Sequence, residues 1–547
     1  MKYCFFKKIC YISFAITIVF IISIFSGCKK SKFDNLISYS FLNDVHNLDP
    51  QTACESEEIT IINNIYEGLF KKSLDGGYEN GVAKNIEISE DEKKYTFELK
   101  QNVFWKMPNK PNEKNKVTAQ DFVFAFKRLI SPKTNSPYAS NYFFIKNAKK
   151  INEGKEDLNN LGISAASDNK LILELEFATP FLKQLLAETP AMPCNKDFFE
   201  STNGRYGLTK ANIASNGPFF LSSWETTGKT KKIKIRRNAD YHFKDIVKII
   251  GVNFSIRDKD SAFNLFQKKE TNTAIVDQTQ FDELSKNEIT SQNFQNSVSG
   301  LVFNNNIPFF ALKETRFALS SAVNREILKN KLTKSQTIAY NIVPNSVTIN
   351  GVCYNKQRPD GEPLCPKYNP DIAKKLITAS KNIMKNENKN FNINSYSILI
   401  NSEKHFVLDQ LLQTWQKDLN IFLKIQPEDK ETYYKKLKNK EFDIALITLN
   451  SKYNSPASIL SGFKNNSPFN YMSYDIPEFD ETLNFAISPT ISHTLTKYFK
   501  AEQMICHNGY FIPLFFETSY FVHDSKLKNI IFSPASKKFY YAYSEHV

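Results

Sequence analysis

The stretch VTAQDFVFAFKRL, residues 117–129, contains the start and the body of one helix. Thr118 can cap its start, because Asp121 follows three residues later, where the second side chain of a capping box stands. The apolar run then continues to Leu129. Pro132 follows shortly afterwards, and the residue before a proline avoids helical backbone angles. We therefore predict a capped helix that ends near Leu129 and turns most of its apolar side chains to the core.

On both sides of this helix the apolar pattern changes to the period of a strand. Residues 95–100 and 171–177 alternate apolar and polar side chains, which indicates half-buried strands. Further along, the patterns predict helices over 309–331, 373–384 and 406–419, and strands over 422–425 and 442–447. This mixture predicts an α/β fold in which helices cover mixed sheets.

The composition is that of a folded chain with a basic excess. The 547 residues are enough for three or four domains, and the contents of 41% hydrophobic and 23% charged residues exclude wholesale disorder. The formal charge is +14, but lysines are interspersed with Asp and Glu, as in Glu90-Asp91-Glu92-Lys93-Lys94. This pattern favours a solvated mixed surface, and we do not expect a nucleic-acid partner.

The N-terminus has the pattern of an export signal. Three lysines precede an uncharged stretch over 9–28, and Ser26-Gly27-Cys28 resembles the lipobox at which bacterial lipoproteins are cleaved and acylated. We predict a signal peptide over 1–27, lipidation of Cys28 and a location in the periplasm or cell envelope, where acyl chains hold the protein on a membrane. Phe25 departs from the Leu that is usual there, and an uncleaved signal anchor is the alternative.

Five cysteines would remain in the mature chain after Cys28. Cys353 and Cys365 flank a polar, turn-rich loop and are the predicted disulfide, with two buried free thiols as the alternative. The pairing of Cys54, Cys194 and Cys506 is open. No CxxC pair accompanies them, so a zinc site is poorly supported.

The sequence contains no recognisable catalytic motif. The seven histidines are scattered without HExxH spacing, and the chain has no Gly-x-Ser-x-Gly and no G-x-G-x-x-G motif. Gly228-Lys229-Thr230 resembles the end of a P-loop without its first glycine, and residues 226–232 read better as a hairpin turn. We expect neither an enzyme nor a cofactor.

Taken in order, several short motifs resemble the extracellular solute-binding proteins of family 5, the oligopeptide-binding proteins of bacterial ABC importers. Each motif is weak alone, but their order and spacing match over nearly the whole mature chain. The matching segments are 48–50, 66–69, 95–105, 117–129, 136–139, 216–224, 237–241, 304–305, 316–325, 368–376 and 442–445.

The resemblance implies a periplasmic-binding-protein type II fold, with two lobes of mixed sheets, a hinge and an extra domain. By analogy, lobe I comprises 28–66, 194–298 and 508–547, the extra domain comprises 67–193, and lobe III comprises 299–507. The crossings between the lobes would lie near 299–306 and 509–516. Such lobes close on a ligand bound between them.

The resemblance also implies the ligand contacts. Relatives bind a peptide as an added β-strand, so backbone hydrogen bonds give affinity without particular side chains. We expect those contacts from two segments, with Tyr138 beside them and further contacts from Tyr453 and Asn454. The two segments are Cys54-Glu55-Ser56 and Thr448-Leu449-Asn450.

One position departs from the family pattern. Lys452 stands where an Asp commonly pairs with the α-ammonium of the peptide, and a lysine would repel that group. Either the ligand lacks a free amino end there or another acid serves, for which Asp277 and Glu55 are candidates. The third possibility is that Lys452 points to solvent. We hypothesise a ligand that is modified or carries an anionic group toward Lys452.

The implied function is a lipid-anchored, monomeric peptide receptor that delivers its ligand to the permease and ATPase subunits of an ABC importer. The alternatives are a binding protein of the same fold for a modified or cell-wall peptide or another solute, and a sensor without a transport role. A secreted hydrolase is disfavoured because no nucleophile and base are evident.

Overall fold

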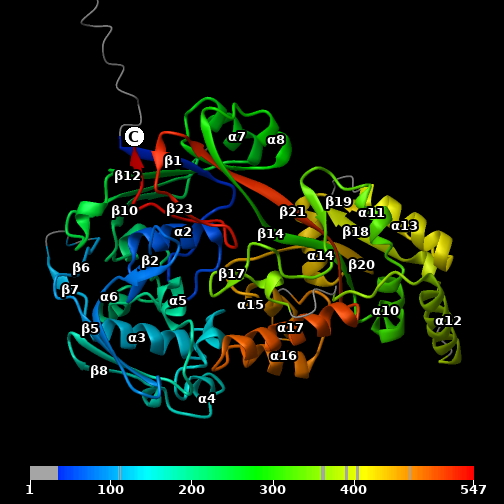
Figure 1. The fold of residues 1–547 in the computed structure, drawn as a ribbon, viewed down its shortest axis with the longest axis horizontal. Helices are drawn as coiled ribbons and strands as arrows, with labels where there is room; N and C mark the ends of the chain where they lie inside the picture. Colours follow the sequence, from blue (N-terminus) through cyan, green and yellow to red (C-terminus); the bar gives the residue numbers. More distant parts are fainter. Residues whose placement is uncertain are drawn as a thin grey trace, which may run out of the picture.

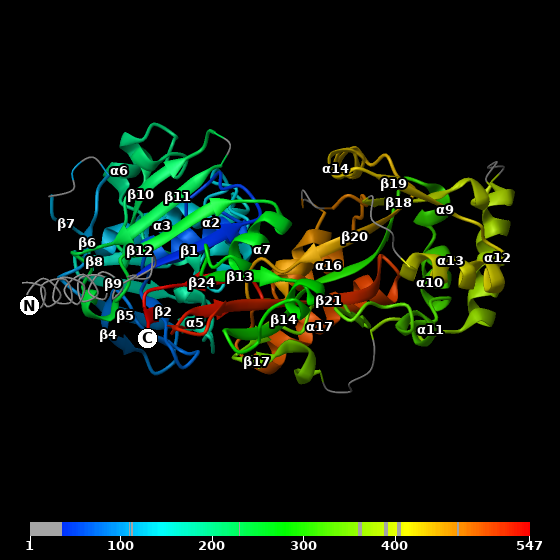
Figure 2. The same cartoon turned by 90° about the horizontal axis from the view of Figure 1, so that it is seen from above.

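The computed structural model describes residues 35–108, 110, 113–228, 230–358, 364–387, 392–401, 406–465, 467 and 470–547. The predicted signal peptide and Cys28 lie outside these residues. The molecule has two halves side by side, as Figures 1 and 2 show. Chain segments before about residue 290 form one half together with the C-terminus, and the segments between form the other.

One mixed sheet of eleven strands runs through both halves. The pairs β1–β12 and β18–β19 are parallel, whereas β10–β11 and β14–β21 are antiparallel. In spatial order the strands are β10 (Phe219–Glu225), β11 (Lys232–Arg237), β12 (Gly251–Ile256), β1 (Leu36–Phe41), β13 (Thr273–Val276), β21 (Phe511–Asp524), β14 (Ile289–Phe303), β20 (Ile444–Asn450), β18 (Ser397–Asn401) and β19 (Lys424–Glu428), with β15 (Gln336–Ile338) beside β21.

Two long strands connect the halves. β14 has 15 residues and β21 has 14, and they pair along most of their length. One end of β21 pairs with β13, and the far end of β14 pairs with β20. Figure 2 shows both strands running from one half into the other.

A second sheet of four strands lies apart from the large one, and the capped helix packs against it. Its order is β4 (Ala83–Ile88), β5 (Lys94–Leu99), β9 (Lys170–Glu174) and β8 (Ile163–Ser167). The helix is α3 (Ala119–Ile130), and Thr118 and Asp121 form the predicted capping box. The predictions of this helix and of the strands at 95–100 and 171–177 are therefore confirmed to within a few residues.

Short antiparallel pairs and the remaining helices complete the fold. The pairs are β2 (Phe70–Lys72) with β3 (Tyr78–Asn80), β6 (Phe104–Trp105) with β7 (Asn115–Lys116), β16 (Thr348–Ile349) with β17 (Val352–Cys353), β22 (Leu527–Lys528) with β25 (Glu545–His546), and β23 (Ile531–Ser533) with β24 (Lys538–Tyr540). The helices are α2 (Ser56–Ile65), α4 (Ala148–Asn152), α5 (Leu182–Ala187), α6 (Lys196–Ser201), α7 (Lys259–Gln267), α8 (Gln278–Asp282), α9 (Pro308–Ala311), α10 (Lys313–Ser321), α11 (Arg325–Lys329), α12 (Pro370–Asn386), α13 (Phe406–Leu419), α14 (Lys430–Asn439), α15 (Ala457–Leu460), α16 (Pro477–Asn484) and α17 (Ile491–His507).

The single helix predicted over 309–331 is wrong. The segment forms three short helices, α9, α10 and α11. Leu312 has extended backbone angles between the first two, and Asn324 caps the third by accepting a hydrogen bond from the amide of Ile327. The apolar spacing persists across these breaks, so periodicity alone does not reveal them.

The C-terminal segment packs on α2, the first helix of the described residues. Asn64 in α2 is fully buried, and its Nδ2 donates to the carbonyl of Phe539 at 2.9 Å. Its Oδ1 accepts from the amide of Tyr541 at 2.8 Å. Two ends of the sequence are thus joined by one buried amide side chain.

The predicted Cys353–Cys365 disulfide is absent, because the five cysteines among the described residues are free thiols. Cys353 is half-buried in the β16–β17 hairpin. Cys365 points instead into the core, where its thiol hydrogen-bonds with that of Cys506 in α17. Flanking a loop in sequence therefore did not bring these two sulfurs together.

Candidate functional site

Two of the predicted ligand-contacting segments meet between the halves. The Nζ of Lys452 lies 2.8 Å from the Oε1 of Glu55, and 397 residues separate the two positions in the chain. The Lys452 side chain is 27% exposed, so it does not simply point to solvent. This contact joins the start of α2 to the segment that follows β20.

Local hydrogen bonds fix both members of this pair. Glu55 caps α2, with Glu58 as the second member of the capping box. On the other side, the Ser458 hydroxyl accepts hydrogen bonds from the amides of Lys452 and Tyr453, at 2.5 and 3.1 Å. Both segments are therefore held by their own neighbours, independently of the ion pair.

The end of β20 has one edge available for pairing. Residues Ser297–Ser299 of β14 pair with Thr448–Asn450 along one edge. On the other edge, β18 pairs only with Ile444 and Ala445, and no described strand continues past them. Unpaired backbone groups at a strand edge can accept an added strand.

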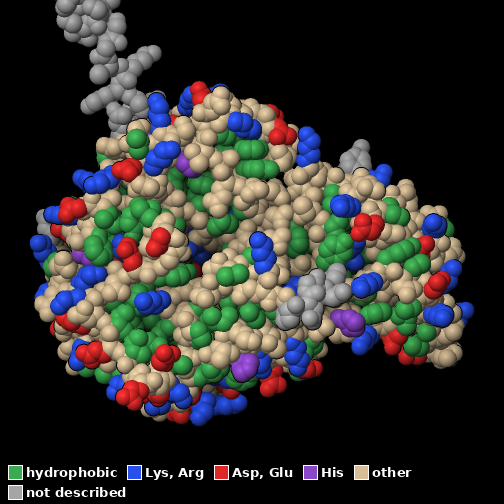
Figure 3. Space-filling model, in the orientation of Figure 1, with side chains coloured by type: hydrophobic (Ala, Val, Ile, Leu, Met, Phe, Trp, Pro, Cys, Tyr) green, Lys and Arg blue, Asp and Glu red, His purple; other side chains and the backbone are tan. Residues whose placement is uncertain are grey.

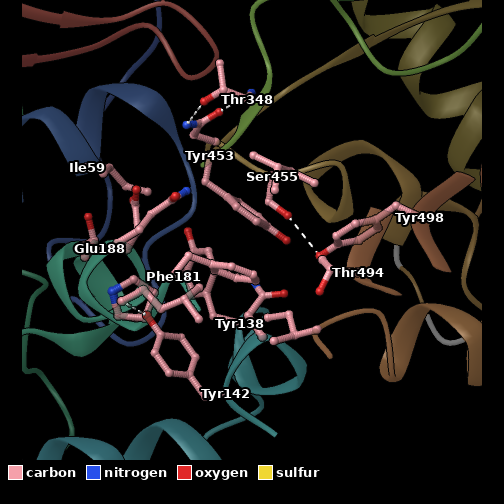
Figure 4. A pocket seen from close by; sticks show the side chains of 18 of the residues that line it. Ile59, Tyr138, Tyr142, Phe181, Glu188, Thr348, Tyr453, Ser455, Thr494 and Tyr498 are labelled. Carbon is pink, nitrogen blue, oxygen red and sulfur yellow. Dashed lines mark hydrogen bonds between the residues drawn. The ribbon is translucent and has the colours of Figure 1, made fainter. Parts of the chain in front are cut away.

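An aromatic cavity lies next to the segment that follows β20, from which Tyr453 and Ser455 line it (Figure 4). Its volume is about 50 Å³, and we call it the aromatic cavity. Tyr138 and Tyr453 contact each other edge to face, with ring centroids 5.6 Å apart. The Tyr138 hydroxyl donates to the carbonyl of Ala53 at 2.7 Å. The ring of Tyr138 therefore contacts the Lys452 side of the site while its hydroxyl contacts the Glu55 side.

Polar side chains frame the aromatic cavity. Asn454 and Thr348 exchange two hydrogen bonds of 2.8 Å, and the hydroxyls of Ser455 and Tyr498 lie 3.2 Å apart. Burial raises the pKa of Tyr498 to about 12, so its hydroxyl stays protonated. The cavity thus offers these neutral hydrogen-bonding groups, together with the charged pair Lys538–Glu188, around an apolar centre.

Glu502 positions the loop that carries Thr348. Its fully buried carboxylate accepts hydrogen bonds from the amides of Ile342 and Val343, at 2.7 and 2.8 Å, and from the Tyr354 hydroxyl at 3.0 Å. Burial raises the pKa of Glu502. The loop is therefore anchored to a buried side chain of α17.

A wider cleft continues from the aromatic cavity. Its volume is about 830 Å³, and the lining residues shared with the aromatic cavity include Phe181, Gln184, Thr348 and Asn454. Elements of both halves line it, among them the β23 strand and the segment around Asn350. The hollow is large enough for a ligand of several residues.

On the face drawn in Figure 3, basic and acidic side chains are intermingled around the molecule.

A third cavity lies on the other side of the Lys452–Glu55 pair. Its volume is about 210 Å³. Residues of β1 and β13, Ser56 and Asn450 line it together with Glu55, Glu57, Lys452 and Lys537, and we call it the lysine cavity. The side chains that follow one another at 452 and 453 thus face different cavities, as successive residues of an extended segment do.

The structure brings most of the predicted site residues together but not all. Glu55, Ser56, Tyr138, Asn450, Lys452, Tyr453 and Asn454 line the cavities, while Cys54, Thr448 and Leu449 belong to the segments between them. Asp277 lies elsewhere, where it caps α8 and pairs with Lys259. Burial raises the pKa of the Cys54 thiol to about 11, so it is not a ready nucleophile.

Several lining residues had no signal in the sequence. Thr348, Phe181, Tyr498 and Lys537 come from four distant segments, and no motif distinguishes them from other residues of their types. Within the described residues, no group of three or more His, Cys, Asp or Glu side chains is arranged to hold a metal ion. The arrangement can bind and enclose a ligand, and it offers no paired nucleophile and base.

Residues 77–471 match the family model of the bacterial extracellular solute-binding proteins, family 5. The chain belongs to this family. It is 26% identical to the oligopeptide-binding protein OppA of Bacillus subtilis over 92% of both chains. It is also 26% identical to the dipeptide-binding protein of Lactococcus lactis over 96% of both chains.

The fold of this chain is similar to that of solved structures. The structure of Listeria monocytogenes OppA bound to peptide superposes with a TM-score of 0.74, at 22% identity, over 94% of this chain and 99% of the other. This family 5 member therefore has the expected α/β solute-binding fold with a large mixed sheet. Its relatives are substrate-binding proteins and not enzymes. None of the helices in the described part of the chain has the length and apolar character to cross a bilayer.

Proposed function

We propose that this family 5 protein captures peptides between its two halves and delivers them to the permease and ATPase subunits of an ABC importer. The observation that carries the proposal is the free edge of β20 at Thr448–Asn450, which reaches the lysine cavity at Asn450 and is followed by Tyr453 and Asn454 of the aromatic cavity. A peptide strand added there would use its backbone for affinity and send alternate side chains into the hollows.

The proposal includes the domain division inferred from the sequence. Lobe I (28–66, 194–298 and 508–547) and the extra domain (67–193) would form one side of the cleft, and lobe III (299–507) the other. The lobes would close by bending β14 and β21. Closure is then the signal that the importer reads, because a ligand favours the closed form only by binding it more tightly.

We further propose that the protein acts as a monomer, anchored through acylated Cys28 in the periplasm or cell envelope. Metabolic labelling with a radioactive fatty acid should label the wild-type chain and not Cys28→Ser. Equal labelling of both would contradict the anchor while leaving ligand capture untouched.

Native mass spectrometry of the purified full chain tests ligand capture. We expect co-purified ligand of peptide mass, which is lost on unfolding and replaced when tetra-alanine is added. A different class of bound solute, or no binding of any peptide from dipeptides to pentapeptides, would contradict the proposal.

The Lys452–Glu55 pair favours peptides that have no free amino group at their N-terminus. Glu55 is the acid nearest to the expected place of the peptide amino end, and Lys452 already neutralises it. Peptides with a blocked or modified amino end would avoid competing with that lysine. Titration with free and N-acetylated peptides tests this, and a strong loss of affinity on acetylation would contradict it.

A further inference from the structure

Four charged side chains line the lysine cavity, and they differ in how well they are paired. Lys452 and Glu55 form the ion pair across the site. The Glu57 carboxylate accepts two hydrogen bonds from Asn43, through its backbone amide at 3.3 Å and its Nδ2 at 2.9 Å. Three of the four charges therefore have a hydrogen-bonding partner.

Lys537 is the exception. Among the contacts of the described residues, its Nζ takes part in no hydrogen bond or ion pair and lies 5.9 Å from the centroid of the Phe294 ring. Its side chain is half-buried and lines the cavity. A desolvated cation without an acceptor is costly, and an anion brought into the cavity would relieve that cost.

The backbone holds Lys537 in place without help from its side chain. Lys537 has a left-handed φ of 53° in the turn between β23 and β24, and the amide of Ser536 bonds to the carbonyl of Ser533. The next residue, Lys538, lines the aromatic cavity and lies 3.9 Å from Glu188. The two successive lysines thus line cavities on opposite sides of the Lys452–Glu55 pair, and of the two only Lys538 has a carboxylate of the described residues within 4 Å.

Burial changes the charge balance of this cavity. It raises the pKa of Glu57 and lowers that of Lys537. Burial therefore disfavours the charged form of both groups. Among the described residues neither has a counter-ion within hydrogen-bonding distance, and Glu57 acts on Lys537 only at longer range. Asn43 already donates hydrogen bonds to Glu57, so the group that lacks a hydrogen-bonding partner is the ammonium of Lys537.

We propose that the lysine cavity binds a carboxylate of the ligand and that Lys537 is the residue that sets this preference. The inference rests on the proposed peptide-binding function. Ser56, Asn450 and Lys452 border both the cavity and the proposed peptide strand, so a side chain or a chain end of that strand can reach Lys537. The carboxylate can belong to an acidic side chain or to the C-terminus of a short peptide.

Calorimetric titration of the purified full chain tests this with a matched peptide set. The set is tetra-alanine, its four single Glu variants, the four corresponding Gln variants, and tetra-alanine amide. We expect one Glu peptide to bind at least tenfold more tightly than its Gln counterpart. If the C-terminus supplies the carboxylate, amidation of tetra-alanine causes the tenfold loss instead.

In Lys537→Gln the difference in affinity between the Glu and Gln peptides, or between tetra-alanine and its amide, should fall below twofold. The affinity for the peptide of each pair that lacks the carboxylate should stay within twofold of the wild-type value. Lys526→Gln removes an exposed lysine that does not line the cavity and should preserve the preference. Lys537→Met is the second variant, and thermal unfolding verifies that both variants are folded.

The outcomes separate the two proposals. Binding of the peptides without any carboxylate preference, or a preference that survives in both Lys537 variants, overturns the role of the lysine cavity alone. If neither neutral nor acidic peptides bind, the peptide-binding function itself is overturned, and this inference falls with it.

Discussion

Tyr138 and Tyr453 stand edge to face between the two halves of the molecule, and the hydroxyl of Tyr138 bonds to the backbone of Ala53. One aromatic side chain therefore contacts a neighbour of each segment proposed to bind the ligand backbone, since Ala53 precedes Cys54 and Tyr453 follows β20. Its ring and its hydroxyl have separate roles that substitutions can distinguish.

Tyr138→Ala should lower the affinity for tetra-alanine about tenfold and destabilise the fold by about 3–5 kcal/mol, because a buried ring leaves a cavity. Tyr138→Phe keeps the ring and should cost about 1 kcal/mol for the lost hydrogen bond. Urea unfolding and calorimetric titration measure the two effects. Tyr434→Ala is the control, since that side chain is 53% exposed, and a similar loss there would contradict the assignment.

Lys452→Asp should favour a free amino end. The substitution removes the cation that lies 2.8 Å from Glu55 and leaves an acidic site that attracts an ammonium group. We expect the ratio of affinities for tetra-alanine over N-acetyl tetra-alanine to rise at least tenfold in calorimetric titration. Lys435→Asp, which changes an exposed lysine of α14, should leave the ratio unchanged. An unchanged ratio in Lys452→Asp would show that residue 452 does not face the ligand.

Asp121 should make stability depend on pH between about 4 and 6. Burial raises the pKa of Asp121 from 3.8 to about 6, although Trp105, Thr118 and Asn195 donate hydrogen bonds to it. The folded state then holds the proton more tightly than the unfolded chain. The stability that this group contributes is present in full below pH 3.8 and is lost as the pH rises through about 6.

The variant Asp121→Asn removes this titration. Between pH 4 and pH 7 the unfolding free energy of the variant should gain up to about 3 kcal/mol relative to wild type, at about 1.4 kcal/mol per pKa unit. Urea titrations at pH 4, 5, 6 and 7 measure it. Asp91→Asn, at an exposed position, should show no such gain. Parallel curves for wild type and Asp121→Asn would refute the prediction.

The five thiols of the described residues should react in a definite order. Cys353 is half-buried and should react first with a maleimide at pH 7, followed slowly by Cys54, whose pKa burial raises to about 11. The three buried thiols, Cys194, Cys365 and Cys506, should react only after unfolding. Mass spectrometry counts the adducts, and Cys353→Ser should abolish the fast phase. If Cys353 and Cys365 react only after the protein has been treated with a reductant, the disulfide predicted from the sequence is present and this prediction is wrong.

Short-range signals predicted the local structure well. The capping box of Thr118 and Asp121 lies within four residues, so the sequence itself shows the hydrogen bonds that begin α3. The turn expected at 226–232 connects the antiparallel strands β10 and β11. The helix expected over 309–331 failed because an Asn cap in its middle resembles any other polar residue on a helix surface.

The site was only partly accessible from the sequence. Family resemblance located Glu55 and Lys452, yet the ion pair between them depends on the distance between two halves of the molecule. Lys537 could not be found, because it is one of 71 basic residues and differs from the others only in its surroundings. Asp277 was an equally reasonable acid in the sequence, but capping α8 commits it elsewhere.

The buried amide of Asn64 has a consequence for folding during synthesis of the chain. Its partners at 539 and 541 leave the ribosome some 475 residues after it, which at 5–20 residues per second is on the order of half a minute to a minute and a half. Throughout that time α2 lacks its final packing surface, and β13 lacks β21 beside it. A chain interrupted even shortly before its end would therefore leave α2 without this packing, and we expect such fragments to depend on chaperones for their solubility.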